Sequence, residues 1–156
     1  HTPLHRGFSC FLFNKKGELL LQQRSHKKKT WPLVWSNTCC GHPALGESGE
    51  DAVRRRLSFE LGIVGVDPVV VLPEYRYKAE RFGVVEHELC PVFVGFFHGE
   101  PTINSNEVEA VRWVLWSDFL QEMKERPGWY SEWCEEEALL LSQSSMFRDL
   151  FISYMK

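Results

Sequence analysis

Two adjacent thiols, Cys39 and Cys40, precede the imidazole of His42 in the segment Trp35–Pro43, which reads WSNTCCGHP. A glycine and a proline interrupt the same segment, so regular secondary structure does not continue through it. A thiolate is a reactive base and nucleophile, and an imidazole is a common metal ligand. This segment therefore indicates a reactive site rather than part of a packed core.

A second group of polar side chains lies on a predicted strand, where Glu86 and Glu88 point to the same face of a sheet. We expect a four-residue turn over Glu80–Gly83 before this strand. That register would put Tyr77 opposite Glu86, and the preceding tyrosine opposite Glu88. Because two carboxylates on a core-facing surface are costly without a counter-charge, we expect a partner cation there.

The segment after the thiols predicts one helix, which begins after Ser48 and ends at Gly62. Serine is a typical N-cap and glycine a typical stop signal. Apolar residues four apart predict its buried stripe, which consists of Val53, Leu57 and Leu61. Arg56 and Glu60 lie on the flank of that stripe, where a helix at the edge of the core lines a cavity.

Alternating apolar residues and turn signals predict the remaining elements. The expected strands are Gly7–Phe13, Glu18–Arg24, Val66–Leu72, Tyr75–Ala79, Val84–Phe97 and Glu109–Leu115, and further helices are expected to begin at Ser117, Glu132 and Ser145. The pattern shows no repeat or linker, so we expect one α/β (α+β) domain over residues 1–156. Because the chain begins at His1 rather than at a methionine, we expect its N-terminus to be incomplete.

The composition limits the classes of function. The net charge of −3 gives no signal for a nucleic-acid partner, and no apolar run reaches the roughly 18 residues of a membrane span. Five cysteines are an odd number without a disulfide spacing, which favours reduced thiols and a cytoplasmic protein. Six tryptophans favour a pocket with flat apolar walls.

The run from Gly41 to Ile63 resembles the Nudix box, G-x5-E-x7-R-E-U-x-E-E-x-G-U, in which U is an apolar residue. The chain agrees with the box at seven positions, which are Gly41, Glu47, Arg55, Leu57, Glu60, Gly62 and Ile63. This resemblance implies the Nudix fold, in which a mixed β-sheet is sandwiched between helices.

Two positions depart from the box, because Arg56 and Phe59 stand where the box has glutamates. Nudix hydrolases use clustered helix glutamates to hold divalent cations that activate water against a diphosphate. Arg56 removes one of these carboxylates and can instead bind a phosphate oxygen. Glu60 remains and can hold one Mg²⁺ that also binds the phosphates. We therefore predict a helix that binds a diphosphate but is impaired in hydrolysing it.

From Leu4 to Trp133 the chain also resembles the type I isopentenyl-diphosphate isomerases. The shared features are a Cys-x-His-Pro motif that contains Cys40 and His42, a tyrosine-bearing strand and a Glu-x-Glu pair. The thiol and the Glu-x-Glu pair are not general Nudix features, so this resemblance is specific. It implies an enzyme of isoprenoid biosynthesis that interconverts isopentenyl and dimethylallyl diphosphate.

Moving a double bond by one carbon adds one proton and removes another, and the intermediate is a tertiary carbocation. An acid must therefore face one side of an apolar pocket and a base the other. We expect Cys40, as a thiolate, to be the base or a relay, and Glu88, assisted by Tyr77, to be the acid. Trp133 matches the family's pocket tryptophan, whose ring face would stabilise the cation. Cys39 is then expected to be a packing residue.

The resemblance to the isomerases also implies a metal site of three histidines and two glutamates. Four of these ligands have a match in the chain, namely His5, His42, Glu86 and Glu88. Such a mixed set suits Zn²⁺, Mn²⁺ or Fe²⁺ more than Mg²⁺ alone. The third histidine is either His1 or a residue upstream of it. A second ion, Mg²⁺, would bind at Glu60 together with the diphosphate.

Three basic side chains are candidates to bind that diphosphate, namely Arg24, Lys28 and Arg56. The basic run Lys27–Lys29 would provide the local positive field that attracts an anion. By resemblance the three side chains match substrate-binding positions of the isomerases, and Ser9 and Asn37 are further candidates.

Two other functions remain open. A Nudix diphosphohydrolase acting on a nucleoside or prenyl diphosphate would share the fold, and the missing box glutamates count against it. A thiol or metal sensor built on an inactive Nudix domain would bind metal without turnover. We prefer the isomerase, acting as a monomer on a small-molecule diphosphate, without a nucleic-acid or membrane partner.

Overall fold

The computed structural model describes residues 4–156, so the predicted ligand His1 lies outside the described residues. The strands are β1 (His5–Arg6), β2 (Phe8–Phe13), β3 (Glu18–Arg24), β4 (Trp35–Ser36), β5 (Cys39–Gly41), β6 (Val69–Leu72), β7 (Arg76–Arg81), β8 (Val84–Leu89), β9 (Val92–Phe96) and β10 (Val108–Leu115). The helices are α1 (Gly49–Leu61), α2 (Trp116–Glu125), α3 (Glu132–Ser142) and α4 (Ser145–Met155). None of the helices within residues 4–156 has the length and apolarity needed to cross a membrane.

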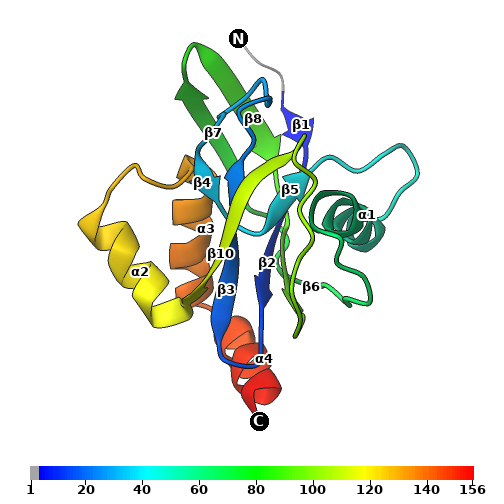
Figure 1. Ribbon diagram of the computed structural model, residues 1–156, viewed down its shortest axis with the longest axis vertical. Helices are drawn as coiled ribbons and strands as arrows, with labels where there is room; N and C mark the ends of the chain where they lie inside the picture. Colours follow the sequence, from blue (N-terminus) through cyan, green and yellow to red (C-terminus); the bar gives the residue numbers. More distant parts are fainter. Residues whose placement is uncertain (1–3) are drawn as a thin grey trace.

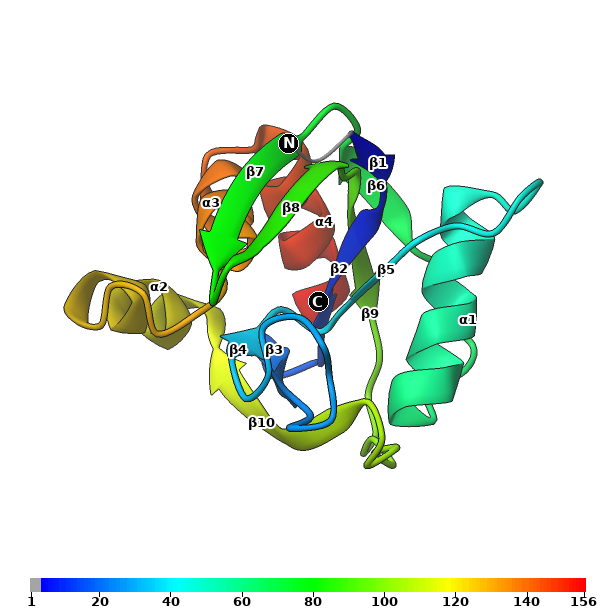
Figure 2. The same cartoon turned by 90° about the horizontal axis from the view of Figure 1, so that it is seen from above.

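The main sheet has the strand order β10-β3-β2-β9-β6, and the short strands β4 and β5 pair with β3 and β2. Helix α1 lies on one side of this sheet, and α2, α3 and α4 lie on the other (Figures 1 and 2). Every residue of β2 is buried, as expected for a strand that is covered on both faces. Phe11 and Phe13 pack with the cluster around α2–α4, whereas Cys10 and Leu12 pack with the cluster around α1. The predicted mixed sheet between helices is therefore present.

A second, smaller sheet has the order β1-β8-β7 and continues the main sheet through two breaks. Strand β1 leads through Gly7 into β2, and β8 leads through Cys90 and Pro91 into β9. The two breaks lie side by side, since the Gly7 amide donates to the carbonyl of Leu89 at 2.9 Å. The expected single strand Val84–Phe97 is therefore wrong. Pro91 has no N–H to donate, and the chain changes sheets there.

The hairpin of β7 and β8 has a different register from the one predicted. Tyr77 lies opposite Glu88, and Ala79 lies opposite Glu86. The prediction failed because the turn has two residues, Phe82 and Gly83, rather than four, and both have positive φ, at 53° and 76°. As a result, Tyr77 lies opposite Glu88 and not opposite Glu86, its partner in the predicted register.

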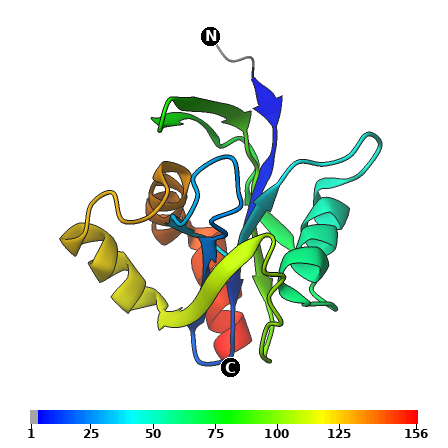
Figure 3. The same cartoon turned by 45° about the horizontal axis from the view of Figure 1, so that its top comes forward.

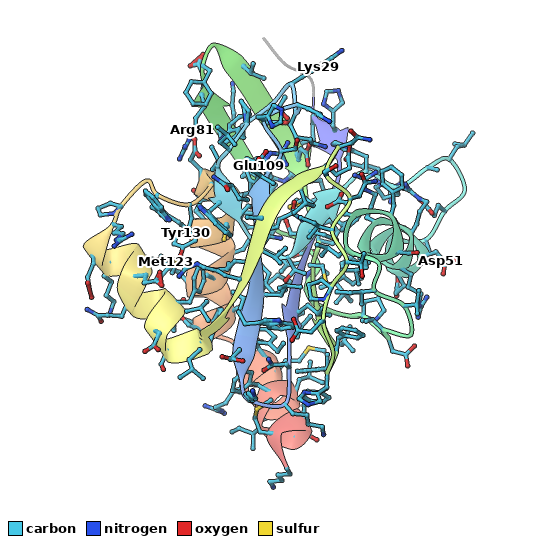
Figure 4. The ribbon with its side chains drawn as sticks, in the orientation of Figure 1. Lys29, Asp51, Arg81, Glu109, Met123 and Tyr130 are labelled. Atoms are coloured by element: carbon cyan, nitrogen blue, oxygen red, sulfur yellow. The ribbon has the colours of Figure 1, made fainter. Side chains whose placement is uncertain are left out.

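The hairpin bends over the end of the main sheet, near the loop between β3 and β4 (Figure 3). Arg81 on the hairpin contacts the start of α3, because its guanidinium forms an ion pair with Glu132 at 2.9 Å. Arg81 also donates to the carbonyls of Gly128 and Tyr130, at 3.0 and 3.1 Å (Figure 4). These contacts hold the hairpin in place against the start of α3.

The caps of α1 confirm the predicted helix. The hydroxyl of Ser48 accepts from the Asp51 amide at 3.1 Å, and Gly62 ends the helix with a left-handed φ of 63°. All three residues of the predicted stripe are fully buried. The predicted start of the next helix at Ser117 is wrong. Helix α2 begins at Trp116, and its N-cap is Leu115.

Candidate active site

A pocket of about 320 Å³ opens between the β7–β8 hairpin, the β3–β4 loop, β5, α1 and α3. Ten of the predicted site residues line it, namely Ser9, Arg24, Lys28, Cys40, His42, Arg56, Tyr77, Glu86, Glu88 and Trp133. These residues come from segments far apart in the sequence. The fold therefore brings the predicted thiol, carboxylates, aromatic rings and basic side chains into one place.

Glu88 lies where the two sheets meet, and its side chain is almost fully buried against Gly7. A Cβ atom added at Gly7 would clash with Glu88 Oε1, so the carboxylate would have to move from its place. The other carboxylate oxygen of Glu88 lies 2.7 Å from Nε2 of His42. The carboxylate of Glu88 therefore lies between the backbone of Gly7 and the imidazole of His42.

The charges around Glu88 act strongly on one another. Burial, and then the charge of Glu88, raises the pKa of Glu86 to about 7. The hydrogen bond to Glu88 raises the pKa of His42, against the opposing effect of burial. Arg55 supports this arrangement, because its guanidinium donates to the His42 carbonyl at 3.1 Å and forms an ion pair with Glu47 at 2.9 Å. Glu47 and Arg55 are two of the positions at which the chain agrees with the Nudix box.

The side chains around Glu88 fit a divalent cation by their chemistry. Imidazole nitrogen and carboxylate oxygen are suitable donors, and a cation would relieve the repulsion between Glu86 and Glu88. His5 lies beside Glu88 on the neighbouring parallel strand, with an exposed side chain. Within residues 4–156, no three His, Cys, Asp or Glu side chains are already grouped as ligands. The structure thus brings together His42, Glu86 and Glu88, and places His5 at their edge.

The two adjacent thiols have different surroundings. Cys39 is 1% exposed and packs with the cluster around α1, as expected for a packing residue. Cys40 lines the pocket, and its thiol donates to Oδ1 of Asn37 at 3.4 Å and lies 3.5 Å from the hydroxyl of Ser9. Burial raises the pKa of Cys40 to about 12, which favours the neutral thiol over the thiolate in this pocket.

Asn37, a predicted substrate-binding residue, lines the small cavity that adjoins the main pocket and not the main pocket itself. Its side chain is fully buried, and its amide donates to the carbonyls of Cys10 and Cys39 at 3.1 and 3.0 Å. Its oxygen accepts from the thiol of Cys40. These contacts use both ends of the amide, so Asn37 positions the thiol.

Aromatic rings form the wall of the pocket beside Glu88. Tyr77 stacks on Trp133 with ring centroids 5.4 Å apart, and Trp31 meets Trp133 edge to face at 5.2 Å. Burial, and then the charge of Glu88, raises the pKa of Tyr77, so its phenol stays protonated and can donate a hydrogen bond. The wall presents π-faces next to the thiol and the carboxylates, which suits a cationic species.

The opposite end of the pocket carries the basic side chains. Arg56 donates to Glu60 and to Glu107, the latter at 2.6 Å, and Lys28 pairs with Glu107 at 2.9 Å. Burial alone would lower the pKa of Arg56, but the two glutamates outweigh it and raise the pKa. Arg24 is fixed separately, since its guanidinium donates to the backbone carbonyl of Thr30 at 2.8 and 3.0 Å.

Glu60 lies beneath these basic residues and not on the main pocket wall. It is 4% exposed, and it accepts from Gln22 at 3.0 Å and from Arg56. It lines a small adjoining cavity together with polar residues such as Gln22 and Glu107 and with the basic side chains of Arg24 and Lys28. The carboxylates of Glu60 and Glu107 supply the oxygen donors that Mg²⁺ prefers.

Sequence reasoning missed Glu107 and Glu137. Glu107 follows a turn in which no periodicity marks it, and only its pairing with Lys28 and Arg56 shows its place in the site. Glu137 is a fully buried carboxyl on α3. One signal was available for Glu137, because it lies four residues after Trp133 and therefore on the same face of a predicted helix.

The chain as a whole resembles proteins of a known family. A model of the NUDIX domain matches residues 3–134. An isopentenyl-diphosphate Delta-isomerase from Saccharopolyspora erythraea is 50% identical over 137 residues, which is 87% of this chain and 71% of that protein. One from Escherichia coli K12 is 44% identical over 138 residues, covering 88% of this chain and 76% of that protein.

Solved structures with low identity share the fold. A MutT protein from Methanosarcina mazei has a TM-score of 0.67 at 21% identity, covering 99% of this chain and 94% of that one. A MutT NUDIX hydrolase from Burkholderia pseudomallei has a TM-score of 0.64 at 20% identity, covering 88% and 97%. At these identities the likeness concerns the arrangement of the sheet and helices alone.

The ion pairs of Arg56 predict that its replacement destabilises the protein more than replacement of Arg54 on the same helix. Arg56→Met would leave the buried Glu60 without its cation, and we expect it to lower the free energy of unfolding by about 3 kcal/mol. Arg54→Met removes exposed ion pairs with Asp51 and Asp67 and should change it by less than about 1 kcal/mol. Urea unfolding measures both variants, and equal effects would contradict this account of Glu60.

Proposed function

The chain belongs to the Nudix family, and we propose that it is an isopentenyl-diphosphate Δ-isomerase, which interconverts isopentenyl and dimethylallyl diphosphate in isoprenoid biosynthesis. One observation carries the proposal. Cys40 and Glu88 line the same pocket from different strands, next to stacked aromatic rings and with basic side chains at the other end. The identity of 44–50% to curated isomerases over most of the chain supports it.

The reaction needs one group that gives a proton to the alkene and another that takes a proton from the adjacent carbon. Cys40 and Glu88 are this pair. Because the interconversion is reversible, each residue acts as acid in one direction and as base in the other. The neutral thiol supports a Cys40 that carries a proton before substrate binds. Tyr77, opposite Glu88 in the hairpin, assists by donating a hydrogen bond.

Trp133 and Tyr77 stabilise the carbocation that forms between the two proton transfers. Their stacked faces carry negative π-density and no basic atom that would capture the cation. Trp133 is also only 3% exposed, so little solvent reaches this part of the pocket wall. Exclusion of water matters here, because water would add to a tertiary cation and yield an alcohol.

The diphosphate binds at the basic end of the pocket. Arg24 and Lys28 reach it from β3 and the following loop, and Arg56 reaches it from α1. Ser9 lies deeper, beside the thiol. Arg56 already bridges Glu60 and Glu107, so its charge is held at the place where a hydrolase has a box carboxylate. Together with Phe59 this replacement argues against the diphosphohydrolase alternative.

We further propose that two divalent ions bind in this pocket. His5, His42, Glu86 and Glu88 would hold one, namely Mn²⁺, Zn²⁺ or Mg²⁺, and His1 would complete its ligands. Glu60 would hold Mg²⁺ together with the diphosphate. A bound divalent ion makes a coordinated carboxyl more acidic and neutralises phosphate charge.

The five cysteines are all unpaired, which supports a proposed location in the reducing cytoplasm. We propose that the chain acts as a monomer on a small-molecule substrate. Size-exclusion chromatography should then give a mass near 18.2 kDa, and an elution at twice that mass would overturn this part of the proposal.

The two adjacent thiols provide a matched test of the catalytic pair. Incubation with isopentenyl diphosphate and Mg²⁺ should give dimethylallyl diphosphate, with deuterium uptake from heavy water. Cys40→Ala and Glu88→Gln should each lower both signals by about 100-fold or more, because each removes one proton transfer. Cys39→Ala should retain substantial activity. A dead Cys39→Ala with an active Cys40→Ala would show that the thiol is wrongly assigned.

The histidine ligand has a matched control in His26. Both imidazoles are 61% exposed and bonded to a glutamate, at 2.7 Å for His42 and 2.8 Å for His26, but only His42 lines the pocket. We expect His42→Ala to lower the amount of Mn²⁺ or Zn²⁺ retained after dialysis, measured by elemental analysis. His26→Ala should retain the wild-type amount. Equal retention by both variants would contradict the proposed site.

A further inference from the structure

Glu132, the first residue of α3, joins three segments that surround the pocket. Its oxygen Oε1 accepts from the indole Nε1 of Trp31 at 3.1 Å and from the guanidinium of Arg81 at 2.9 Å. Trp31 lies in the loop between β3 and β4, and Arg81 lies on β7 of the hairpin. One carboxylate oxygen therefore links the loop, the hairpin and the helix, although Glu132 does not itself line the pocket.

The three segments meet at the aromatic wall. Trp133 follows Glu132 directly in α3, and its side chain lines the pocket. The ring of Trp31 meets that of Trp133 edge to face at 5.2 Å, and the ring of Tyr77 stacks on it at 5.4 Å. Trp133 therefore has one ring contact from the loop and another from the hairpin, which are the two segments that Glu132 joins.

The loop depends on Glu132 more than the hairpin does. Trp31 is 1% exposed, so its indole N–H would be left in the interior without this acceptor, at a cost of about 1–3 kcal/mol. Its φ of 49° is uncommon for a residue other than glycine, so contacts of the side chain must hold the loop in this conformation. Arg81, in contrast, also donates to the carbonyls of Gly128 and Tyr130. Loss of the carboxylate would therefore release Trp31 and leave the hairpin attached.

We propose that Glu132 is a positioning residue, which holds Trp31 against Trp133 and thereby keeps water away from the carbocation. The inference rests on the proposed function, in which a tertiary carbocation forms beside Trp133. If water reaches this cation, the water oxygen forms a bond to the cationic carbon and one proton leaves the water. The product is a tertiary alcohol that still carries the diphosphate. The share of this alcohol among the products therefore measures how well the wall excludes water.

The test incubates the full chain with isopentenyl diphosphate and Mg²⁺ and measures the tertiary alcohol and dimethylallyl diphosphate by NMR. Glu132→Ala should raise the share of alcohol at least about tenfold above that of the wild type, because Trp31 loses its acceptor. Glu132→Gln should stay within about twofold of the wild type, because its amide oxygen has two lone pairs for the same two donors. Trp31→Phe removes the other end of the hydrogen bond and should resemble Glu132→Ala.

Glu122→Ala is the matched control. Glu122 on α2 also accepts from a guanidinium and from an aromatic side chain, those of Arg112 at 2.5 Å and Tyr130 at 3.2 Å, and neither of these lines the pocket. The side chains of Glu122 and Glu132 are similarly exposed, at 27% and 35%. Glu122→Ala should lower the urea midpoint as Glu132→Ala does, but it should keep the wild-type share of alcohol. A general loss of stability would not give this difference.

The inference is overturned if Glu132→Ala or Trp31→Phe keeps the wild-type share of alcohol. It is also overturned if Glu122→Ala raises the share equally, or if Glu132→Gln raises it as much as Glu132→Ala. The wild-type protein, assayed in parallel, separates this inference from the proposed function. A wild type that forms no dimethylallyl diphosphate overturns the proposed function, whereas an active wild type confines the failure to Glu132.

Discussion

The close approach of the Glu88 carboxylate to the backbone of Gly7 is the constraint on which the site depends. Any side chain at position 7 would occupy the space of Glu88 Oε1. The approach is possible because both strand pairs break at the same level, at Gly7 in one and at Cys90–Pro91 in the other. This double break separates the two sheets and leaves a pocket between them. It also directs Glu88 into the pocket that Cys40 lines from β5, and explains how a nearly buried carboxylate and a thiol share one cavity.

Arg56 decides what the Nudix scaffold can do with a bound diphosphate. Its guanidinium lies between Glu60 and Glu107, and so it supplies a fixed positive charge where the box motif has a carboxylate. A cation at this position binds phosphate oxygen but cannot hold the ions that activate water. Under the proposed function, the pocket therefore binds the diphosphate without hydrolysing it, and the thiol, the carboxylate and the aromatic wall act on the carbon chain.

Local patterns in the sequence predicted α1 completely, because its cap, stop and stripe all come from residues within one helix. They failed at the β7–β8 hairpin, where Phe82 adopts positive φ and shortens the turn to two residues. Phenylalanine gives no signal for that conformation, so the register was two residues off. Glu107 and Glu137 were missed because their partners, Lys28 and Cys90, lie 79 and 47 residues away in the chain.

The protonation state of Cys40 was also beyond the sequence. The motif around it indicates a reactive thiol, but its pKa depends on burial that only the assembled pocket creates. The same holds for Glu86, whose shift comes from burial and from Glu88 on the same strand. The sequence therefore predicts which residue types are candidates for the reaction. Their protonation before substrate binds depends on burial and neighbouring charges, which only the structure shows.

The central claim is that this Nudix pocket moves protons on carbon and leaves the diphosphate intact. The most direct measurement is a single turnover of the unmodified protein with isopentenyl diphosphate and Mg²⁺ in heavy water, followed by NMR of the products. The account predicts dimethylallyl diphosphate with one deuterium in a methyl group and no released phosphate. Release of inorganic phosphate or a prenyl monophosphate, without a deuterated isomer, would contradict it.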